Sequence, residues 1–206
     1  MAESRAIAER AEEVFPGVWR WCIHNERIGG AESTSHAVRA EDGLVFLDPV
    51  RLAADAVASL GAVSAICLTA QCHQRSAWRY RRELGAPVYA PEGTRPMEEE
   101  PDERYREGDA LPGGLRALRT PGPEQVHFSF LRPGDPSILF CSDLLTHYDG
   151  RSLDFVPLEY HDDPEETRRT VESLLDLDFD VLCLDHGSPL ADNPKGAIRD
   201  LLDRTA

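Results

Sequence analysis

The sequence predicts an α/β (α+β) protein built as a four-layer αββα sandwich, with two mixed β-sheets face to face and helices on the outer faces. Short apolar runs typical of strands alternate with helical segments in both halves of the chain. Hairpins and strand–helix units both occur, and a mixed sheet needs both kinds of connection. No internal repeat divides the 206 residues, so we expect one domain over residues 1–206.

The first half of the chain is expected to consist mostly of strands. Residues 18–24 suit a strand, and residues 35–49 suit a hairpin that turns at Glu41–Gly43. Residues 51–60 have helical spacing and stop at Gly61, a common C-terminal signal. A strand buried on both faces is expected next, at residues 64–69, followed by a polar loop at 70–76. A helix should follow at 76–84 and another strand at 87–92.

The second half repeats this mixture after an acidic, proline-rich excursion at residues 94–104. Three consecutive strands are expected at residues 115–120, 125–132 and 136–143. Asp163 and Pro164 have the residue types that begin a helix, which should run to about Leu177. A buried strand and a closing helix are expected at residues 179–185 and 194–204.

Composition and charge exclude several classes of protein. With 41% apolar and 29% charged residues the chain is globular rather than disordered. The formal net charge of −15 disfavours nucleic acid and anionic membranes as partners. The charged N-terminal stretch lacks the apolar core of a signal peptide, and no apolar run is long enough to span a bilayer.

The cysteines and the one basic cluster both suggest ordinary structural roles. Three of the five cysteines, Cys67, Cys141 and Cys183, lie in apolar strand-like runs, where a thiol packs as a small hydrophobic group. This usage predicts a reduced, cytoplasmic protein. Four arginines gather within eight positions, and we expect a solvated helix face there: Arg75, Arg79, Arg81 and Arg82.

Several short motifs occur in an order that points to one family. A predicted strand ends in Asp48, and a buried strand runs into Thr69 and the loop AQCHQRSA. A Thr-Pro-Gly turn follows at residues 120–122, a later apolar strand ends in Asp143, and the last strand ends in His186-Gly. Over nearly its whole length the chain therefore resembles the metallo-β-lactamase superfamily. The resemblance implies the αββα fold and, in active members, a metal-dependent hydrolase.

The metal-ligand motif of that family is heavily altered here. In such proteins the loop after the threonine supplies His-x-His-x-Asp-His, which presents imidazoles and one carboxylate to one or two zinc ions. The four ligand positions of the motif fall here on Ala70, Cys72, Gln74 and Arg75. The histidine that follows the Thr-Pro-Gly turn in the family is replaced by Pro123. Only Asp143 and His186 match the ligands of the family, so the resemblance does not by itself imply hydrolase activity for this chain.

Arg75 is the substitution with the largest electrostatic effect. A guanidinium remains charged in a protein. At about 4 Å and an effective dielectric constant of about 20, it repels a divalent ion by about 8 kcal/mol. Complete structural zinc sites contribute about 10–16 kcal/mol, so we expect no ordinary two-zinc centre and no cofactor. Asp143 at the end of a buried strand needs a partner, and we expect Arg75 to pair with it.

The remaining candidates each have a functional and a structural interpretation. Cys72 and His73 can both ligate zinc, but adjacent residues of an extended chain point in opposite directions, so one of them should face the pocket. His186, next to Asp185, fits a ligand, a hydrogen-bonded pocket histidine or a member of an acid–base pair with Asp143 or Asp185.

The resemblance places other residues at or near the same pocket. The full set of expected pocket residues is Cys72, His73, Gln74, Arg75, Asp48, Asp185, His147 and His161. His147 and His161 belong to a loop-rich stretch, residues 144–163, which the resemblance implies would border the pocket. We expect Asp48 to stabilise the loop backbone and these two histidines to be hydrogen-bonded. His36 is expected to be partly exposed, and His127 and Ser129 to face solvent or the pocket rim.

Two functions are compatible with these residues. The first is a metallo-β-lactamase-fold protein of unknown substrate with an eroded metal site, which is non-catalytic or binds a small-molecule ligand independently of zinc. The alternative is a hydrolase with a single divalent metal such as zinc, held by Asp143, His186 and Cys72 or His73. A structural or dimerisation role remains a third hypothesis, and the sequence leaves the substrate and the oligomeric state open.

Overall fold

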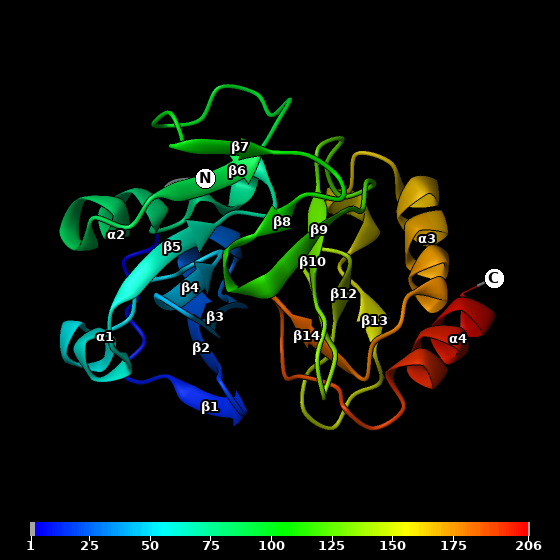
Figure 1. The fold of residues 1–206 in the computed structure, drawn as a ribbon. Helices are drawn as coiled ribbons and strands as arrows, with labels where there is room; N and C mark the ends of the chain where they lie inside the picture. Colours follow the sequence, from blue (N-terminus) through cyan, green and yellow to red (C-terminus); the bar gives the residue numbers. More distant parts are fainter. Residues whose placement is uncertain (1–2, 206) are drawn as a thin grey trace.

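The computed structural model describes residues 3–205 and contains two large sheets that face each other (Figure 1). The seven-stranded first sheet has the strand order β1-β2-β3-β4-β5-β6-β7. Its strands are β1 (Glu12–Phe15), β2 (Val18–Asn25), β3 (Ala31–Ala40), β4 (Gly43–Leu47), β5 (Val63–Cys67), β6 (Val88–Pro91) and β7 (Glu103–Tyr105). Strands β1 to β4 pair antiparallel, whereas β4 to β7 pair parallel. The sheet is therefore mixed, as predicted.

The second sheet comes from the C-terminal half and has the order β14-β11-β10-β9-β8. Its strands are β8 (Ala110–Leu111), β9 (Leu115–Arg119), β10 (Phe128–Arg132), β11 (Ile138–Cys141) and β14 (Val181–Leu184). Strands β11 and β14 are parallel and the other pairs are antiparallel. A short hairpin of β12 (Leu145–Thr146) and β13 (Asp154–Phe155) follows β11.

Helices cover the outer face of each sheet (Figure 1). The helices are α1 (Ala54–Leu60) and α2 (Ala77–Leu84) beside the first sheet, and α3 (Pro164–Ser173) and α4 (Pro194–Arg204) beside the second. Asp163 caps α3 by accepting a hydrogen bond from the Glu166 amide, as its residue type predicted. Gly85 ends α2 in a left-handed conformation with a φ of 70°. The four-layer αββα prediction is confirmed.

The central strands are buried on both faces, which explains their continuous apolar runs. In β4, Val45 and Leu47 pack between the sheets, while Leu44 and Phe46 pack under the helices of the first sheet. Strand β11 divides its side chains in the same way between the inter-sheet core and the layer under α3 and α4. The three strand cysteines, Cys67, Cys141 and Cys183, are buried as expected.

Four side chains differ in burial from the sequence prediction. His36, His127 and Ser129 are almost fully buried, not exposed. Alternation along a strand separates core from solvent only when one face of the sheet is open. Strands β3 and β10 are covered on both faces, and His127 directly precedes β10 and bridges to Ala70. Arg75 is also buried, with 8% of its side chain exposed, and does not belong to the solvated face of α2.

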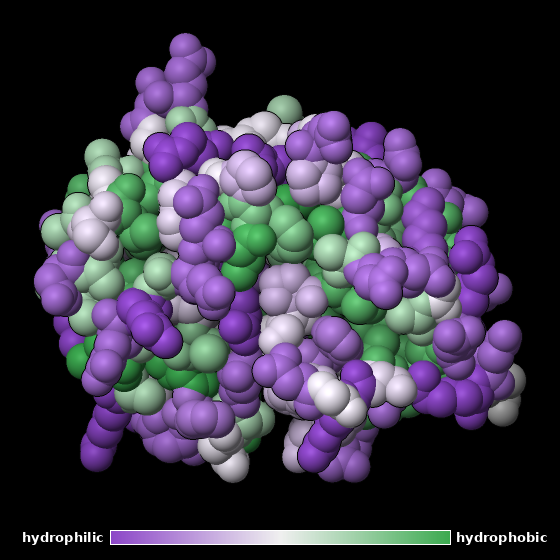
Figure 2. Space-filling model, turned by 90° about the horizontal axis from the view of Figure 1, so that it is seen from below, coloured by the Kyte–Doolittle hydropathy of each residue, from purple (hydrophilic) through white to green (hydrophobic). Residues whose placement is uncertain are grey.

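The protein surface is polar over much of the face seen in Figure 2. On α2 the arginines at positions 79, 81 and 82 form ion pairs with acidic residues, as expected for a solvated helix face. The predicted excursion at residues 94–104 includes the start of β7, which adds a parallel edge strand to the first sheet. No helix in the described part of the chain is long and apolar enough to cross a bilayer.

Candidate functional site

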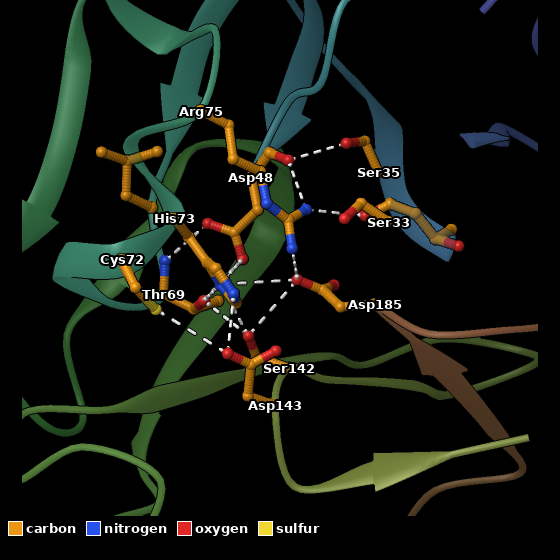
Figure 3. Close-up of polar contacts among 12 residues, drawn as sticks. Ser33, Ser35, Asp48, Thr69, Cys72, His73, Arg75, Ser142, Asp143 and Asp185 are labelled. Carbon is orange, nitrogen blue, oxygen red and sulfur yellow. Dashed lines mark hydrogen bonds and ion pairs between the residues drawn. The ribbon is translucent and has the colours of Figure 1, made fainter. Parts of the chain in front are cut away.

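The candidate site lies where the carboxyl ends of four strands from both sheets meet (Figure 3). Asp48 follows β4, and Thr69 follows the parallel neighbour β5. Asp143 follows β11, and Asp185 follows its parallel neighbour β14. Because parallel neighbours end at the same edge of a sheet, each sheet brings two polar residues to one place. The topology therefore assembles the residues that the sequence motifs singled out.

The loop after Thr69 is a 3₁₀ turn (η2, Gln71–Gln74) rather than an extended segment. As a result, Cys72 and His73 both reach Asp143: Cys72 Sγ lies 3.7 Å and His73 Nε2 lies 3.0 Å from Asp143 Oδ2. Cys72 lines the cavity described below and His73 does not, in agreement with the prediction that one of the two faces the pocket. The reason given for that prediction does not apply, because alternation holds only for extended chain. Asp48 and Arg75 have positive φ values of 44° and 39°, which is unusual for residues with a side chain and marks a constrained loop.

His73 is the centre of the site, with carboxylates around its ring (Figure 3). Its Nδ1 lies 3.1 Å from Asp48 Oδ2 and 3.4 Å from Asp185 Oδ2, and its Nε2 lies 3.0 Å from Asp143 Oδ2. Burial disfavours the charged imidazolium, but the negative charge of Asp143 and its neighbours outweighs burial and raises the pKa of His73 well above its usual value. His73 is therefore an internal cation.

His186 is fixed in the same protonation state by its hydrogen bonds. Its Nδ1 donates to the Glu32 carbonyl oxygen at 2.6 Å, and its Nε2 lies 3.0 Å from Asp143 Oδ1. A carbonyl oxygen can only accept a hydrogen bond, so Nδ1 carries a proton. The ionised carboxylate of Asp143 is also only an acceptor, so Nε2 carries a second proton. Burial opposes this charge, but the hydrogen bond to Asp143 raises the pKa of His186 above its usual value. Both ring nitrogens act as donors.

Asp143 is consequently occupied on both oxygens. One oxygen accepts from His186, and the other accepts from His73 and the Cys72 thiol. Burial favours the neutral carboxyl group, yet the charge of His73 and the hydrogen bond from His186 lower the pKa of Asp143 well below its usual value. Burial also raises the pKa of the Cys72 thiol to about 12, so the thiol is protonated at neutral pH.

Arg75 pairs with Asp185, so the predicted pairing with Asp143 is wrong. Its Nη2 donates to Asp185 Oδ2 at 3.0 Å. Its Nη1 donates to the carbonyl oxygens of Thr34 and Asp48, at 2.8 and 2.9 Å. These carbonyls hold the guanidinium on the Asp185 side, and the oxygens of Asp143 already accept from imidazoles. Asp143 has its cationic partners in His73 and His186 instead.

The site is a charge-balanced cluster. Its anions are Asp48, Asp143 and Asp185, and its cations are His73, Arg75 and His186. Burial raises the pKa of Asp185 to about 6 despite the neighbouring Arg75, so this carboxylate is still ionised at neutral pH. Two hydroxyl groups complete the cluster: Thr69 Oγ1 and Ser142 Oγ each lie 2.9 Å from His73 Nδ1.

The other predicted pocket residues have structural contacts. Asp48 accepts from the Thr69 amide at 2.9 Å, so it stabilises the loop backbone as expected. Gln74 is buried and accepts a hydrogen bond from the Trp78 indole. His147 donates to the Ser188 carbonyl oxygen at 3.0 Å. His161 is hydrogen-bonded to Thr167, with 2.8 Å between Nδ1 and Oγ1, and it does line the pocket described next.

A cavity of about 1080 Å³ opens beside the cluster. Cys72, Asp143 and His186 form the part of its wall that belongs to the cluster. Apolar and aromatic residues line another part: Ile28, Tyr148, Phe155, Val156, Pro157 and Tyr160. Arg27, Arg151 and Arg204 also contribute to the wall. Most of these residues come from loops and from the β12–β13 hairpin, where no sequence motif marked them.

Two groups of side chains bring three potential metal-ligand atoms within 4.8 Å of one another. The first group is Cys72, His73 and Asp143, and the second is Asp48, His73 and Asp185. Both groups depend on His73, whose two nitrogens are already donors. A histidine must lose a proton before it ligates a metal. A neutral imidazole then has one nitrogen with a free lone pair, so His73 can complete only one of the two groups. These residues therefore do not fit a two-metal centre.

Comparison with known proteins identifies the family. A model of the metallo-beta-lactamase superfamily matches residues 53–186. The structure of the DIM-1 metallo-beta-lactamase exposed to ceftazidime is similar, with 15% identity, a TM-score of 0.76, and coverage of 98% of this chain and 99% of that chain. A metallo-beta-lactamase from Pontibacter korlensis has 16% identity, a TM-score of 0.74, and coverage of 95% and 99%. A search of curated proteins finds no significant match.

A third solved structure, TTHA1623 in a di-iron-bound form, has 22% identity and a TM-score of 0.61. The similarity covers 78% of this chain and 90% of that chain. At such identities these structures establish a shared fold, while the activity has to be argued from the residues of this site.

Proposed function

The chain belongs to the metallo-β-lactamase superfamily, and from this premise we propose that it is a member with an eroded metal site that binds a small molecule without zinc. The observation that carries the proposal is the state of Asp143, which accepts hydrogen bonds from two imidazoles, one on each oxygen. A metal ion at this carboxylate would have to displace protons from His73 or His186 and approach the charge of Arg75. Ala70 and Pro123, at two of the altered motif positions, have no side-chain atom that could bind the metal in place of a histidine.

The cavity supports the binding role. Ligand pockets commonly measure about 300–1,000 Å³ and combine apolar walls with a few polar groups. The cavity of about 1080 Å³ has this character, with Phe155 and Tyr160 on its walls. Arg27 and Arg151 add positive charge to the lining of an otherwise acidic protein. We infer that the ligand is a small organic anion with an apolar part, because a guanidinium binds carboxylates and phosphates through charge-assisted hydrogen bonds.

Metal analysis tests the zinc-independent part of this proposal. Protein purified without chelator is expected to contain much less than one metal ion per chain. Its melting temperature should not rise when zinc is added, because a ligand stabilises a protein only if it binds the native state. One equivalent of zinc, iron or manganese per chain, lost on replacing Cys72 by Ala but retained on replacing Cys22 by Ala, would instead establish a metal protein. Cys22 is a suitable control because it lies on β2, outside the cluster.

A ligand screen tests the binding part. Thermal-shift measurements with a panel of small aromatic carboxylates and phosphates should identify compounds that raise the melting temperature. Arg151→Ala is expected to weaken the binding of such a compound about tenfold or more, the typical contribution of one charge-assisted hydrogen bond. Arg169→Ala, which removes an exposed arginine from α3, serves as the matched control and should leave the affinity unchanged. Equal affinities of the wild type and Arg151→Ala would exclude the proposed anion contact.

A one-metal hydrolase is the second candidate, favoured by one specific observation. The potential ligand atoms of Cys72, His73 and Asp143 lie within 4.8 Å of one another, and His186 lies 3.0 Å from the same carboxylate. A bound metal would supply an activated water for hydrolysis. The metal analysis separates the two candidates, since this hydrolase requires a stoichiometric ion. That ion should be lost in His186→Ala and in either Cys72→Ala or His73→Ala, depending on which of the two residues is a ligand.

We further propose a cytoplasmic location and partners other than nucleic acid or membranes. The net charge of −15 supports the second point. The five cysteines are free, and three of them are buried in strands, which supports a reducing compartment.

A further inference from the structure

The charged cluster joins the two sheets of the sandwich. His73 and Arg75 belong to the loop after β5 in the first sheet, whereas Asp143 and Asp185 end strands of the second sheet. The three ion pairs that cross between them measure 3.0 Å for His73–Asp143, 3.4 Å for His73–Asp185 and 3.0 Å for Arg75–Asp185. Each cation also contacts Asp48 of its own sheet, His73 at the carboxylate and Arg75 at the carbonyl oxygen.

Two of these residues, Arg75 and Asp143, occupy positions from which the family pattern draws metal ligands. Arg75 falls on the last histidine of the loop motif, Asp143 on the shared aspartate, and His73 lies between two ligand positions of the motif. In that pattern the positive charge between the carboxylates comes from metal ions. Here the chain supplies positive charge itself, from two neighbouring residues of one loop.

We propose that His73 and Arg75 form a built-in cationic cross-link between the sheets in place of metal ions, and that removing both cations creates a site for a divalent cation. The carboxylates of Asp48, Asp143 and Asp185 all approach the ring of His73, as Figure 3 shows. Without the ring and the guanidinium, three carboxylates border the vacated space. Carboxylate oxygens are preferred ligands of manganese and other hard divalent ions.

This inference is independent of the small-molecule proposal, because the cross-link concerns the buried cluster and the ligand concerns the cavity beside it. Each cation is almost fully buried, with 4% of the His73 side chain and 8% of the Arg75 side chain exposed. Removal of a buried cation leaves carboxylates without compensation, so the protein should lose stability and gain attraction for external cations. A solvated surface pair should show neither effect.

The decisive experiment compares melting temperatures with and without excess MnCl₂. The wild type should not respond to manganese. His73→Ala/Arg75→Ala should melt about 10 °C lower, and saturating manganese should raise its melting temperature by about 5 °C or more. Arg81→Ala/Arg82→Ala is the matched control, because it removes two arginines that pair with acidic residues on the surface, and it should show no manganese response.

Two results would overturn the inference: a double variant that folds without any response to manganese, or a wild type that already binds one ion per chain. If the double variant does not fold, a double-mutant cycle of Arg75→Met, Asp185→Asn and their combination tests whether Arg75 links the two sheets through Asp185. The combination should melt higher than Arg75→Met alone, because it also removes the uncompensated carboxylate. Additive losses in this cycle would exclude a cross-link through Arg75. The effect of Arg151→Ala on ligand affinity, by contrast, tests only the small-molecule proposal.

Discussion

Asp143→Asn is expected to lower the free energy of unfolding by about 3 kcal/mol, because it removes the negative charge that two imidazolium groups share. His73 and His186 each lie 3.0 Å from this carboxylate, and Asn would present one acceptor oxygen and one amide donor to two donors. The loss is at the lower end of the range for buried pairs because 21% of the Asp143 side chain is exposed to the cavity. Urea denaturation at pH 7 measures it.

The control for this prediction is Glu165→Gln. Glu165 pairs with Arg169 on the surface of α3, at 3.8 Å and with 90% of its side chain exposed. Its replacement should change the free energy of unfolding by less than about 1 kcal/mol. If Asp143→Asn had an effect as small as this, the imidazoles would not depend on the carboxylate, and the charge-balanced cluster would be rejected.

The stability of the wild type is expected to fall as the pH rises from 7 to 9, and His73→Gln should reduce this dependence. In the unfolded chain His73 loses its proton near pH 6.5, whereas in the folded protein its pKa is raised well above that value. Above pH 6.5 the folded state therefore binds more protons than the unfolded state, so the free energy of unfolding decreases with pH. Each unit by which the folded pKa exceeds 6.5 corresponds to about 1.4 kcal/mol that is present below pH 6.5.

Urea midpoints measured between pH 7 and 9 test this prediction. Asp185, whose pKa is raised to about 6, changes protonation mainly below this window. His186 also has a raised pKa and contributes in the same direction, so the slope of His73→Gln should be smaller than that of the wild type but not zero. His24→Gln, which changes a histidine exposed on β2, is the matched control and should retain the full slope. Equal slopes for wild type and His73→Gln would show that His73 is not an internal cation.

The sequence was sufficient for the fold because its strongest patterns reflect burial. The apolar runs at β4, β5, β11 and β14 are buried on both faces in the sandwich, and each is followed by the polar residue that the family pattern requires. Asp143 and His186 could be placed for the same reason: each is the second residue after a strand, β11 or β14, whose end is fixed by the sheet.

The arrangement within the site could not be predicted because it depends on the conformation of one loop. The 3₁₀ turn at Gln71–Gln74 and the positive φ of Arg75 turn His73 inward and direct Arg75 to Asp185. The position of His73 is not a ligand position of the family motif, so the motif did not indicate a role for this residue. The stretch that contains the β12–β13 hairpin was expected to border the pocket, and several of its residues line the cavity. The individual lining residues could not be predicted, because their grouping with Arg27, Ile28 and Arg204 appears only in three dimensions.

The division of the cluster between the two sheets has a consequence for how the chain unfolds. The N-terminal half contributes Asp48, His73 and Arg75, an excess of one positive charge, and the C-terminal half contributes Asp143, Asp185 and His186, an excess of one negative charge. Neither half alone neutralises the ions that it buries. Separating the halves would break the three ion pairs between them and uncover the apolar core that the two sheets share. The domain should therefore melt in a single cooperative transition, with no stable half-folded species.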